Sequence, residues 1–232
     1  MENWINIANK EFGITLTEKQ VQQFETLRDF LIEENEKYNL TGISDPREIE
    51  IKHFLDSLSV LPYMSPETKS LIDIGSGAGF PGLPIAIARP NIKVTCLEST
   101  GKKTEFIKRA IEKIGLSNVS IINGRAEEAG MKNVYREYFD VALARAVAGL
   151  PTLLEYALPF VQVGGIFIAQ KSTSETIENS GNALKELSGT IIKIVPVNIP
   201  NLSPRQLVIV EKTKQTPKQY PRVTGIPLKN PL

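Results

Sequence analysis

The chain is short of two residue types that often carry chemistry, with one cysteine, Cys96, and one histidine, His53, among its 232 residues. A single cysteine excludes an internal disulfide and fits a reducing compartment. No apolar run reaches membrane-spanning length, and the N-terminus lacks the basic-then-apolar pattern of a signal peptide. We therefore expect a cytoplasmic protein without a membrane segment.

An excess of one charge sign is also missing. The 27 Lys and Arg residues nearly balance the 26 Asp and Glu residues, giving a formal net charge of +1. This balance neither demands nor excludes a nucleic-acid partner, which would need a local basic surface. The apolar fraction of 41% and the charged fraction of 23% are ordinary for a globular protein of one good-sized domain, with or without a helical annex.

Two amphipathic helices are predicted near the N-terminus. Residues 17–38 carry apolar side chains every three or four positions, behind a capping box of Thr17 and Gln20. A second helix begins at Asp45, with a proline in its first turn. We expect residues 1–65 to form an N-terminal helical cap.

Strands and helices alternate from residue 71 onward, which predicts a parallel sheet with helices on both faces. Two further strands close together near the end predict an antiparallel hairpin. The fold class expected is thus α/β, a Rossmann-like and mostly parallel sheet spanning residues 66–212. A basic, proline-rich tail, 213–232, is expected to pack on this core. The predicted strands are 71–75, 93–98, 119–123, 139–144, 165–170, 191–199 and 205–212, with the clearest helix at 102–114.

A glycine-rich stretch, DIGSGAGFPG, follows the first predicted strand. From Gly77 onward it satisfies the dinucleotide pattern G-x-G-x-x-G. From Asp73 onward it satisfies the shorter acid-then-glycines pattern of S-adenosylmethionine (SAM) enzymes. Either motif alone is weak, and the glycines could also simply shape a tight strand-to-helix turn.

Three observations favour SAM over a dinucleotide. Gly75 stands at the end of the strand, whereas the dinucleotide register begins two residues later. Asp73 is expected to lie close to the ligand, where a carboxylate suits the ammonium or sulfonium group of SAM and repels a pyrophosphate. The terminal hairpin suits the Rossmann-like sheet of class I SAM methyltransferases, which is therefore the core expected for residues 66–212. Glu98 closes the second strand, nineteen residues after Gly79, where an acid accepts hydrogen bonds from the ribose hydroxyls of either ligand.

Residues and motifs that the chain lacks exclude some classes of methyl acceptor. Carbon-5 methylation of pyrimidines needs a cysteine nucleophile, but Cys96 stands mid-strand and is predicted to be a small buried hydrophobe. The Asn/Asp-Pro-Pro-aromatic motif of exocyclic amine methylation is absent. A ring nitrogen with a free lone pair or a small molecule remains. Guanine N7 is such a nitrogen and needs no general base, so we assign no catalytic residue and no metal ligand.

Specific stretches then resemble the RsmG (GidB) family, bacterial methyltransferases that modify guanine N7 in 16S ribosomal RNA. They run nearly end to end: YNLTGI at 38–43, HFLDSL at 53–58, DIGSGAGFPGLPIAI at 73–87, NGRAEE at 123–128, ALARAVAGL at 142–150, and YPR and KNPL in the tail. The resemblance implies SAM as cofactor, and 16S ribosomal RNA or the small-subunit particle as partner. We expect a monomer.

By motif, the resemblance implies SAM contacts from Gly75, Phe80, Ala126, Glu127 and Arg145. The glycine pattern adds Gly77, and the ribose argument adds Glu98. After the second strand the chain reads CLESTGKK, where relatives often have an Asp-Ser-Leu-type segment, so the local turn is expected to differ.

Several polar residues have two interpretations. Arg145 could contact SAM or a phosphate at the carboxyl edge of the sheet, or pair with a nearby acid. His53 fits a half-buried structural role better than a general base. Asn39 and Thr41 could bind a base or cap the adjacent helix.

Basic residues could form a phosphate-binding rim if they share the edge of the SAM pocket, and the tail is expected on that face. The candidates are Lys102, Lys103, Lys171, Lys214, Lys218, Arg222 and Lys229. Three rival functions stay open: a small-molecule methyltransferase, a SAM- or RNA-binding module without turnover, and an NAD oxidoreductase.

Overall fold

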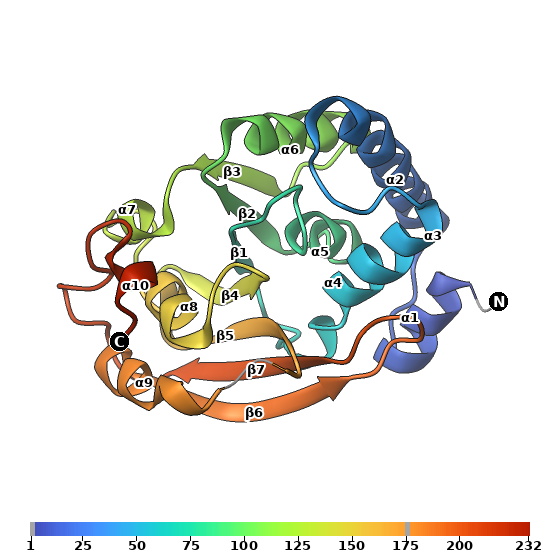
Figure 1. The fold of residues 1–232 in the computed structure, drawn as a ribbon. Helices are drawn as coiled ribbons and strands as arrows, with labels where there is room; N and C mark the ends of the chain where they lie inside the picture. Colours follow the sequence, from blue (N-terminus) through green and yellow to red (C-terminus); the bar gives the residue numbers. More distant parts are fainter. Residues whose placement is uncertain (1–2, 175–176) are drawn as a thin grey trace.

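Seven strands form one sheet in the order β3-β2-β1-β4-β5-β7-β6 in the computed structural model, which describes residues 3–174 and 177–232 (Figure 1). Strands β1 to β5 run parallel, and β7 lies antiparallel to both β5 and β6. The predicted parallel sheet with an antiparallel terminal pair is confirmed. The strands are β1 (Ser70–Ile74), β2 (Lys93–Glu98), β3 (Val119–Asn123), β4 (Phe139–Arg145), β5 (Val161–Ser172), β6 (Gly189–Val197) and β7 (Arg205–Lys212).

Helices cover both faces of the sheet. The face that carries the N-terminal helices is covered by α1 (Trp4–Phe12), α2 (Glu18–Tyr38), α3 (Pro46–Ile49), the π-helix η1 (Glu50–Leu55), α4 (Asp56–Leu58), the 3-10 helix η2 (Leu61–Tyr63), α5 (Gly82–Ala88) and α6 (Gly101–Ile114). The other face is covered by α7 (Ala126–Gly130), α8 (Leu150–Ala157), the 3-10 helix η3 (Glu178–Ser180), α9 (Gly181–Leu187) and α10 (Ile226–Lys229).

Side chains alternate between two hydrophobic cores, one on each face. On β4, Val141 and Leu143 join the core under the N-terminal helices, whereas Ala142 and Ala144 join the core under α8. By this alternation Arg145, the last residue of β4, points to the side of the N-terminal helices. The pleat of the strand therefore decides which elements this arginine can reach.

The caps of the N-terminal helices follow the sequence signals. Thr17 and Gln20 form the predicted capping box at the start of α2, which ends at Asn39 in the left-handed conformation, φ 48°. Asp45 Oδ1 accepts the backbone N–H groups of Arg47 and Glu48 at 2.9 and 3.0 Å. The helix that starts there is not a regular α-helix throughout, because η1 widens it before α4.

The division at residues 65/66 and 212/213 remains a prediction. Aromatic packing of Trp4, Phe24 and Phe54 joins α1, α2 and η1.

Along the residues that the structure describes, no helix has both the length and the apolar character that a bilayer crossing requires.

Candidate functional site

The turn between β1 and α5 is built on glycines in the left-handed region. Gly75, Gly77 and Gly79 have φ angles of 69°, 59° and 86°, which side chains with a Cβ adopt only at a cost. The turn is fixed to the neighbouring strand, because the N–H groups of Gly75 and Ser76 donate to the Leu97 carbonyl at 2.8 and 3.1 Å. The backbone of the first turn therefore lies open at the carboxyl edge of the sheet, where ligands bind in this architecture.

Asp73 does not line that opening, contrary to the expectation that it lies close to the ligand. Its side chain is fully buried, and Oδ2 accepts the N–H of Gly82 at the start of α5 at 2.8 Å. Burial raises the pKa of this carboxyl to about 7. The reason is the strand pleat, which directs Asp73 beneath α5, beside the buried Cys96. Cys96 is the buried hydrophobe that the sequence predicted.

Glu98 is placed where the ribose argument expects an acid, at the carboxyl end of β2. Its Oε2 accepts the N–H of Gly77 at 2.9 Å, and its Oε1 accepts the N–H of Thr100 at 2.8 Å. The carboxylate therefore braces the glycine turn against the start of α6. Each oxygen keeps a second lone pair that could accept a hydroxyl.

A small cavity of ≈ 70 Å³ lies beside the turn and brings together Gly75, Ala126 and Glu127, with Val147 and Tyr156 also on its wall. A methyl group at Gly75 would come within 2.7 Å of Val147 Cγ2. Ligand pockets usually measure roughly 300 Å³ or more, and Val147 narrows the space next to Gly75. Sequence reasoning missed this role of Val147, although the residue belongs to the ARAV stretch.

Glu127 is shared between this cavity and the tail. Its Oε1 accepts the N–H of Gly225 at 2.9 Å, and its residue exposure is 5%. Burial and the Glu127 carboxylate raise the pKa of the Tyr156 hydroxyl to about 12. The tail therefore forms part of the support of the cavity wall.

Arg145 is held by the N-terminal helices. Its Nη1 donates to Asp56 Oδ2 at 2.9 Å and to the Lys52 carbonyl at 3.0 Å, and its Nη2 contacts His53 Nδ1 at 3.2 Å. Asp56 is 2% exposed, so this is a buried ion pair. Of the two interpretations of Arg145, the structure contains the pairing with a nearby acid. Asp56 was missed, although its spacing from His53 within HFLDSL places both on one helix face.

Phe80 belongs to the same cluster. Its ring stacks on the His53 ring with centroids 4.5 Å apart and an interplanar angle of 17°, and Arg145 Cζ lies 5.6 Å from the Phe80 centroid. His53 is 8% exposed, and burial together with the Arg145 charge lowers its pKa to about 3. Its burial exceeds the half-buried role expected from sequence. Thr41 Oγ1 bonds to His53 Nε2 at 3.0 Å, while Asn39 serves as the C-cap of α2.

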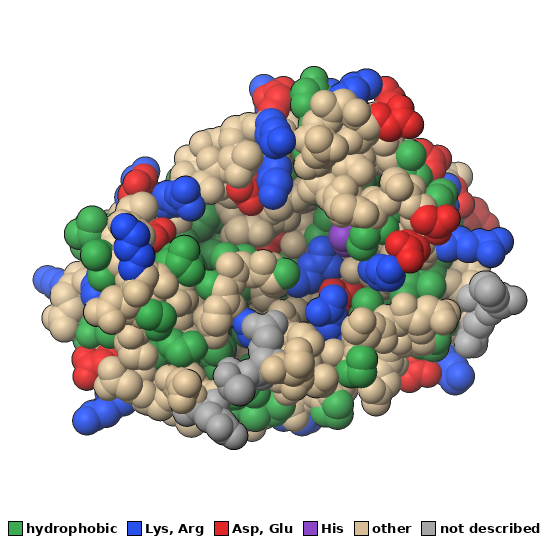
Figure 2. All heavy atoms as spheres, in the orientation of Figure 1, with side chains coloured by type: hydrophobic (Ala, Val, Ile, Leu, Met, Phe, Trp, Pro, Cys, Tyr) green, Lys and Arg blue, Asp and Glu red, His purple; other side chains and the backbone are tan. Residues whose placement is uncertain are grey.

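The predicted site residues thus fall into two groups at one sheet edge. Gly75, Ala126 and Glu127 surround the small cavity, and Phe80 and Arg145 belong to the cluster around His53. Gly77 and Glu98 belong to neither group and are joined to each other by a hydrogen bond. Figure 2 shows that this face is hollowed at its centre, with Lys and Arg side chains around the hollow.

Two of the basic candidates are held by acceptors inside the protein. Lys171 is 3% exposed, and its Nζ donates to the Ala148 carbonyl at 2.6 Å. Arg222 binds both oxygens of Glu155, a fully buried carboxylate, through Nε and Nη2. Lys171 is wrong as a rim residue because it is buried, whereas Arg222 keeps 23% of its side chain exposed and stays a candidate. The other candidates are half-buried (Lys103) or exposed (Lys102, Lys214, Lys218 and Lys229).

The tail does not start on the site face, contrary to expectation. Because β7 is antiparallel, its last residue, Lys212, lies at the amino edge of the parallel strands. Arg136, just before β4, holds the next segment by donating to the carbonyls of Thr216 and Pro217. The chain reaches the site face only later, where Gly225 meets Glu127.

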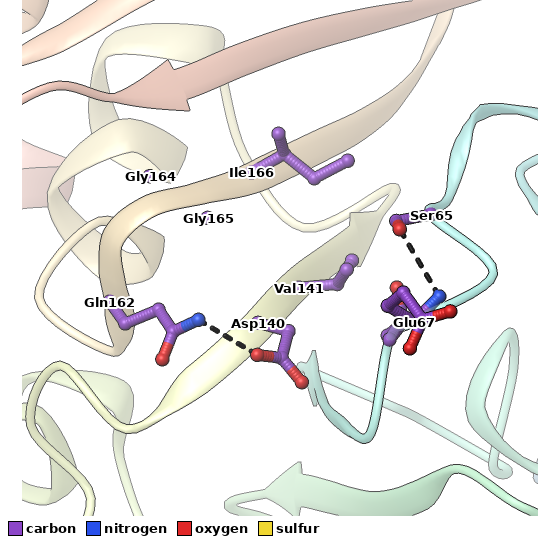
Figure 3. A pocket seen from close by; sticks show the side chains of 9 residues that line it. Ser65, Glu67, Asp140, Val141, Gln162, Gly164, Gly165 and Ile166 are labelled. Atoms are coloured by element: carbon purple, nitrogen blue, oxygen red, sulfur yellow. Dashed lines mark hydrogen bonds between the residues drawn. The ribbon is translucent and has the colours of Figure 1, made fainter.

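A larger hollow of ≈ 230 Å³ lies at the amino edge, away from the glycine turn (Figure 3). Asp140 lines it, but its carboxylate is already engaged. Oδ2 accepts the backbone N–H groups of Lys69 and Ser70, and Oδ1 accepts the Gln162 amide at 2.8 Å. This hollow is therefore a junction between loops rather than the candidate site.

Methyltransferases are among the solved structures that share this fold. A precorrin-6y C5,15-methyltransferase from Geobacter metallireducens superposes with a TM-score of 0.52 at 14% identity, covering 76% of this chain and 92% of that one. A geranyl diphosphate methyltransferase solved in complex with SAM gives 0.53 at 10% identity, covering 68% and 84%. The fold is that of the class I SAM-dependent methyltransferases.

The sequence comparison is more specific. The family model described as "rRNA small subunit methyltransferase G" (GidB) matches residues 20–208. The ribosomal RNA small subunit methyltransferase G of Acetivibrio thermocellus is 48% identical over 223 residues, 95% of this chain and 92% of the relative. The chain belongs to the rRNA small subunit methyltransferase G family, as the sequence resemblance predicted.

Proposed function

We propose that the chain transfers the methyl group of SAM to N7 of a guanine in 16S ribosomal RNA, by direct in-line displacement without a general base. The observation that carries the proposal is the glycine turn at the carboxyl edge of β1, with Glu98, Ala126 and Glu127 around it, in a chain of this family. SAM supplies an activated methyl group on its sulfonium.

The residues present fit such a cofactor. Gly75 leaves a cradle that a Cβ would fill, and Val147 is the side chain that occupies it. Glu98 has lone pairs for ribose hydroxyls at the end of β2. Ala126 and Glu127 begin α7 after β3, where the chain can border an adenine. Phe80, Gly77 and Arg145 complete the proposed cofactor residues around the same edge.

The proposed reaction needs no general base, and the titratable groups near the glycine turn are not suited to act as one. Guanine N7 carries a free lone pair at neutral pH, and the product base becomes cationic, so the site has to align the base rather than remove a proton. His53, with a pKa lowered to about 3, is neutral and adds no charge next to that product. The buried Asp73 has no exposed surface from which to act as a base.

The proposed partner is 16S ribosomal RNA or the small-subunit particle, and we propose that the chain acts as a cytoplasmic monomer. Purified chain with radiolabelled SAM should label 16S RNA, either free or in the particle, and mass mapping should find the label on one guanine as 7-methylguanine. Labelling of a small molecule only, or SAM binding without turnover on RNA, would contradict the proposal. Sedimentation with and without SAM tests the monomer.

A further inference from the structure

We propose that His53 is a positioning residue for methyl transfer, which orients the Arg145 guanidinium by accepting one of its N–H groups at Nδ1. This inference rests on the proposed function. The contact spans 3.2 Å and joins η1 to the end of β4. No step of the transfer proposed above requires His53 to exchange a proton. Any role of His53 in the transfer therefore comes from its contacts.

The contact with Arg145 indicates the tautomer of His53, whose ring also lies within hydrogen-bond reach of the Lys52 backbone. An arginine N–H can only donate, so Nδ1 is the unprotonated acceptor of Arg145 Nη2. The ring proton is then on Nε2 and is donated to Thr41 Oγ1 at 3.0 Å. Thr41 Oγ1 also accepts the N–H of Ile43 at 3.2 Å, which holds the hydroxyl oxygen in place. The direction of donation therefore runs from Arg145 to His53 to Thr41.

Arg145 keeps donors for a ligand. Its Nη1 is used by Asp56 and by the Lys52 carbonyl, and one Nη2–H is used by His53. Within residues 3–174 and 177–232, its Nε–H and its other Nη2–H have no acceptor, and 16% of its side chain is exposed. A planar guanidinium with free N–H groups binds an oxyanion. That oxyanion is the SAM carboxylate or an RNA phosphate.

The ring of His53 is itself held in one orientation. It stacks on Phe80 at 4.5 Å, and Phe80 in turn lies 5.6 Å from Arg145 Cζ. The ring is therefore clamped between a stacking partner and Thr41, so that Nδ1 faces Arg145 in one orientation. A displacement of about 1 Å at such a contact can cost about 100-fold in rate.

Three substitutions separate the functions of the ring. His53→Asn places an amide oxygen near the Nδ1 position and keeps an acceptor for Arg145. His53→Gln places its amide near the Nε2 position and keeps the bond to Thr41. His53→Phe keeps only the stack on Phe80. Ile49→Val, at a fully buried position one turn earlier, is the control for a small loss of stability.

The expected kcat/KM for labelling of 16S RNA falls about 10- to 100-fold in His53→Gln and His53→Phe, and less than about 5-fold in His53→Asn and Ile49→Val. If the loss is in the Kd of SAM, the oxyanion is the cofactor carboxylate. If it is in the KM of RNA at unchanged SAM Kd, the oxyanion is a phosphate. Equal losses in His53→Asn and His53→Gln, or losses that only follow the melting temperature, would overturn the inference.

A second measurement does not depend on activity. Because the chain has one histidine, nitrogen-15 NMR of the imidazole reports His53 without overlap. We expect the Nε2–H tautomer in wild type and a change of the Nδ1 shift in Arg145→Lys. An Nδ1–H tautomer would overturn the positioning role even if RNA is methylated. Conversely, wild type that leaves RNA unlabelled but has the expected tautomer would contradict only the proposed function.

Discussion

Val147 lies against Gly75, so that a methyl group on Gly75 would be 2.7 Å from Val147 Cγ2. The two residues follow β1 and β4, which are neighbours in the sheet. The turn after β4 therefore closes the small cavity at the end of β1. A ligand that reaches the backbone of Gly75 therefore meets this valine.

Gly75→Ala should weaken SAM binding by at least about 10-fold, because the added methyl occupies the cradle, and calorimetry measures the change. It should also reduce stability, since alanine at φ 69° costs about 1–2 kcal/mol. Gly115→Ala is the matched control, with φ 73° and no atom within 4 Å of the added methyl. Adding Val147→Ala should restore part of the stability but not the affinity. Wild-type affinity in Gly75→Ala would exclude the cradle as the cofactor site.

Lys102→Ala should weaken binding to 16S RNA and reduce the slope of log K against log salt by up to about 1. Lys102 is exposed at the start of α6, where its Nζ donates to the Tyr38 carbonyl at 3.0 Å. Lys218→Ala serves as the control, because this exposed lysine follows the tail segment at the amino edge. Filter binding at several salt concentrations compares them. Equal effects of the two variants would contradict RNA binding at the carboxyl edge next to Lys102.

Arg222→Ala should destabilise the fold by about 3–5 kcal/mol, because it leaves the fully buried Glu155 carboxylate without its partner. Urea unfolding measures the free energy. A double variant, Arg222→Leu with Glu155→Leu, should recover much of the loss, since no buried charge remains. If Arg222→Ala instead changed the salt dependence of RNA binding and left the stability unchanged, Arg222 would be a phosphate-binding residue.

The stability of the chain should fall on acidification partly through His53. Its folded pKa of about 3 lies below the ordinary 6.5, so the unfolded chain takes up the proton first. The contribution is complete above pH 6.5 and is lost progressively as the pH falls toward 3. Between pH 7 and pH 5 wild type should lose about 2 kcal/mol more than His53→Asn. Urea unfolding at both pH values tests this. Equal losses of stability in wild type and His53→Asn would mean that folding does not lower the pKa of His53.

Much of the sheet could be predicted because its strands are short apolar runs between glycines and helices. The bounds of β2, β3 and β7 agree with the sequence prediction, as does Gly115 at the end of α6. The strand β5 is longer than predicted, since it continues through Gly164 at φ 85°. The helix α1 was missed because its first turn has no acidic residue and only Asn3 marks its start.

The site was less predictable because its contacts join distant parts of the chain. Motif spacing placed Gly75, Ala126 and Glu127 at one cavity, since the carboxyl ends of parallel strands share an edge. Spacing could not show that Arg145 turns toward Asp56, because the pleat and the entry of η1 decide this together. Nor could it show the course of the tail, which depends on β7 being antiparallel and on Arg136 holding its first part.

The buried pair of Arg145 and Asp56 ties η1 and α4 to the sheet. If these helices detached alone, the ion pair would separate and the core residues Phe54, Leu55 and Leu58 would be exposed, so a local opening there would lose a large part of the packing on this face. Native-state hydrogen exchange should therefore find the slowest amides of η1 protected as long as those of β4. The wall of the candidate site formed by these helices then behaves as part of the rigid scaffold of the sheet.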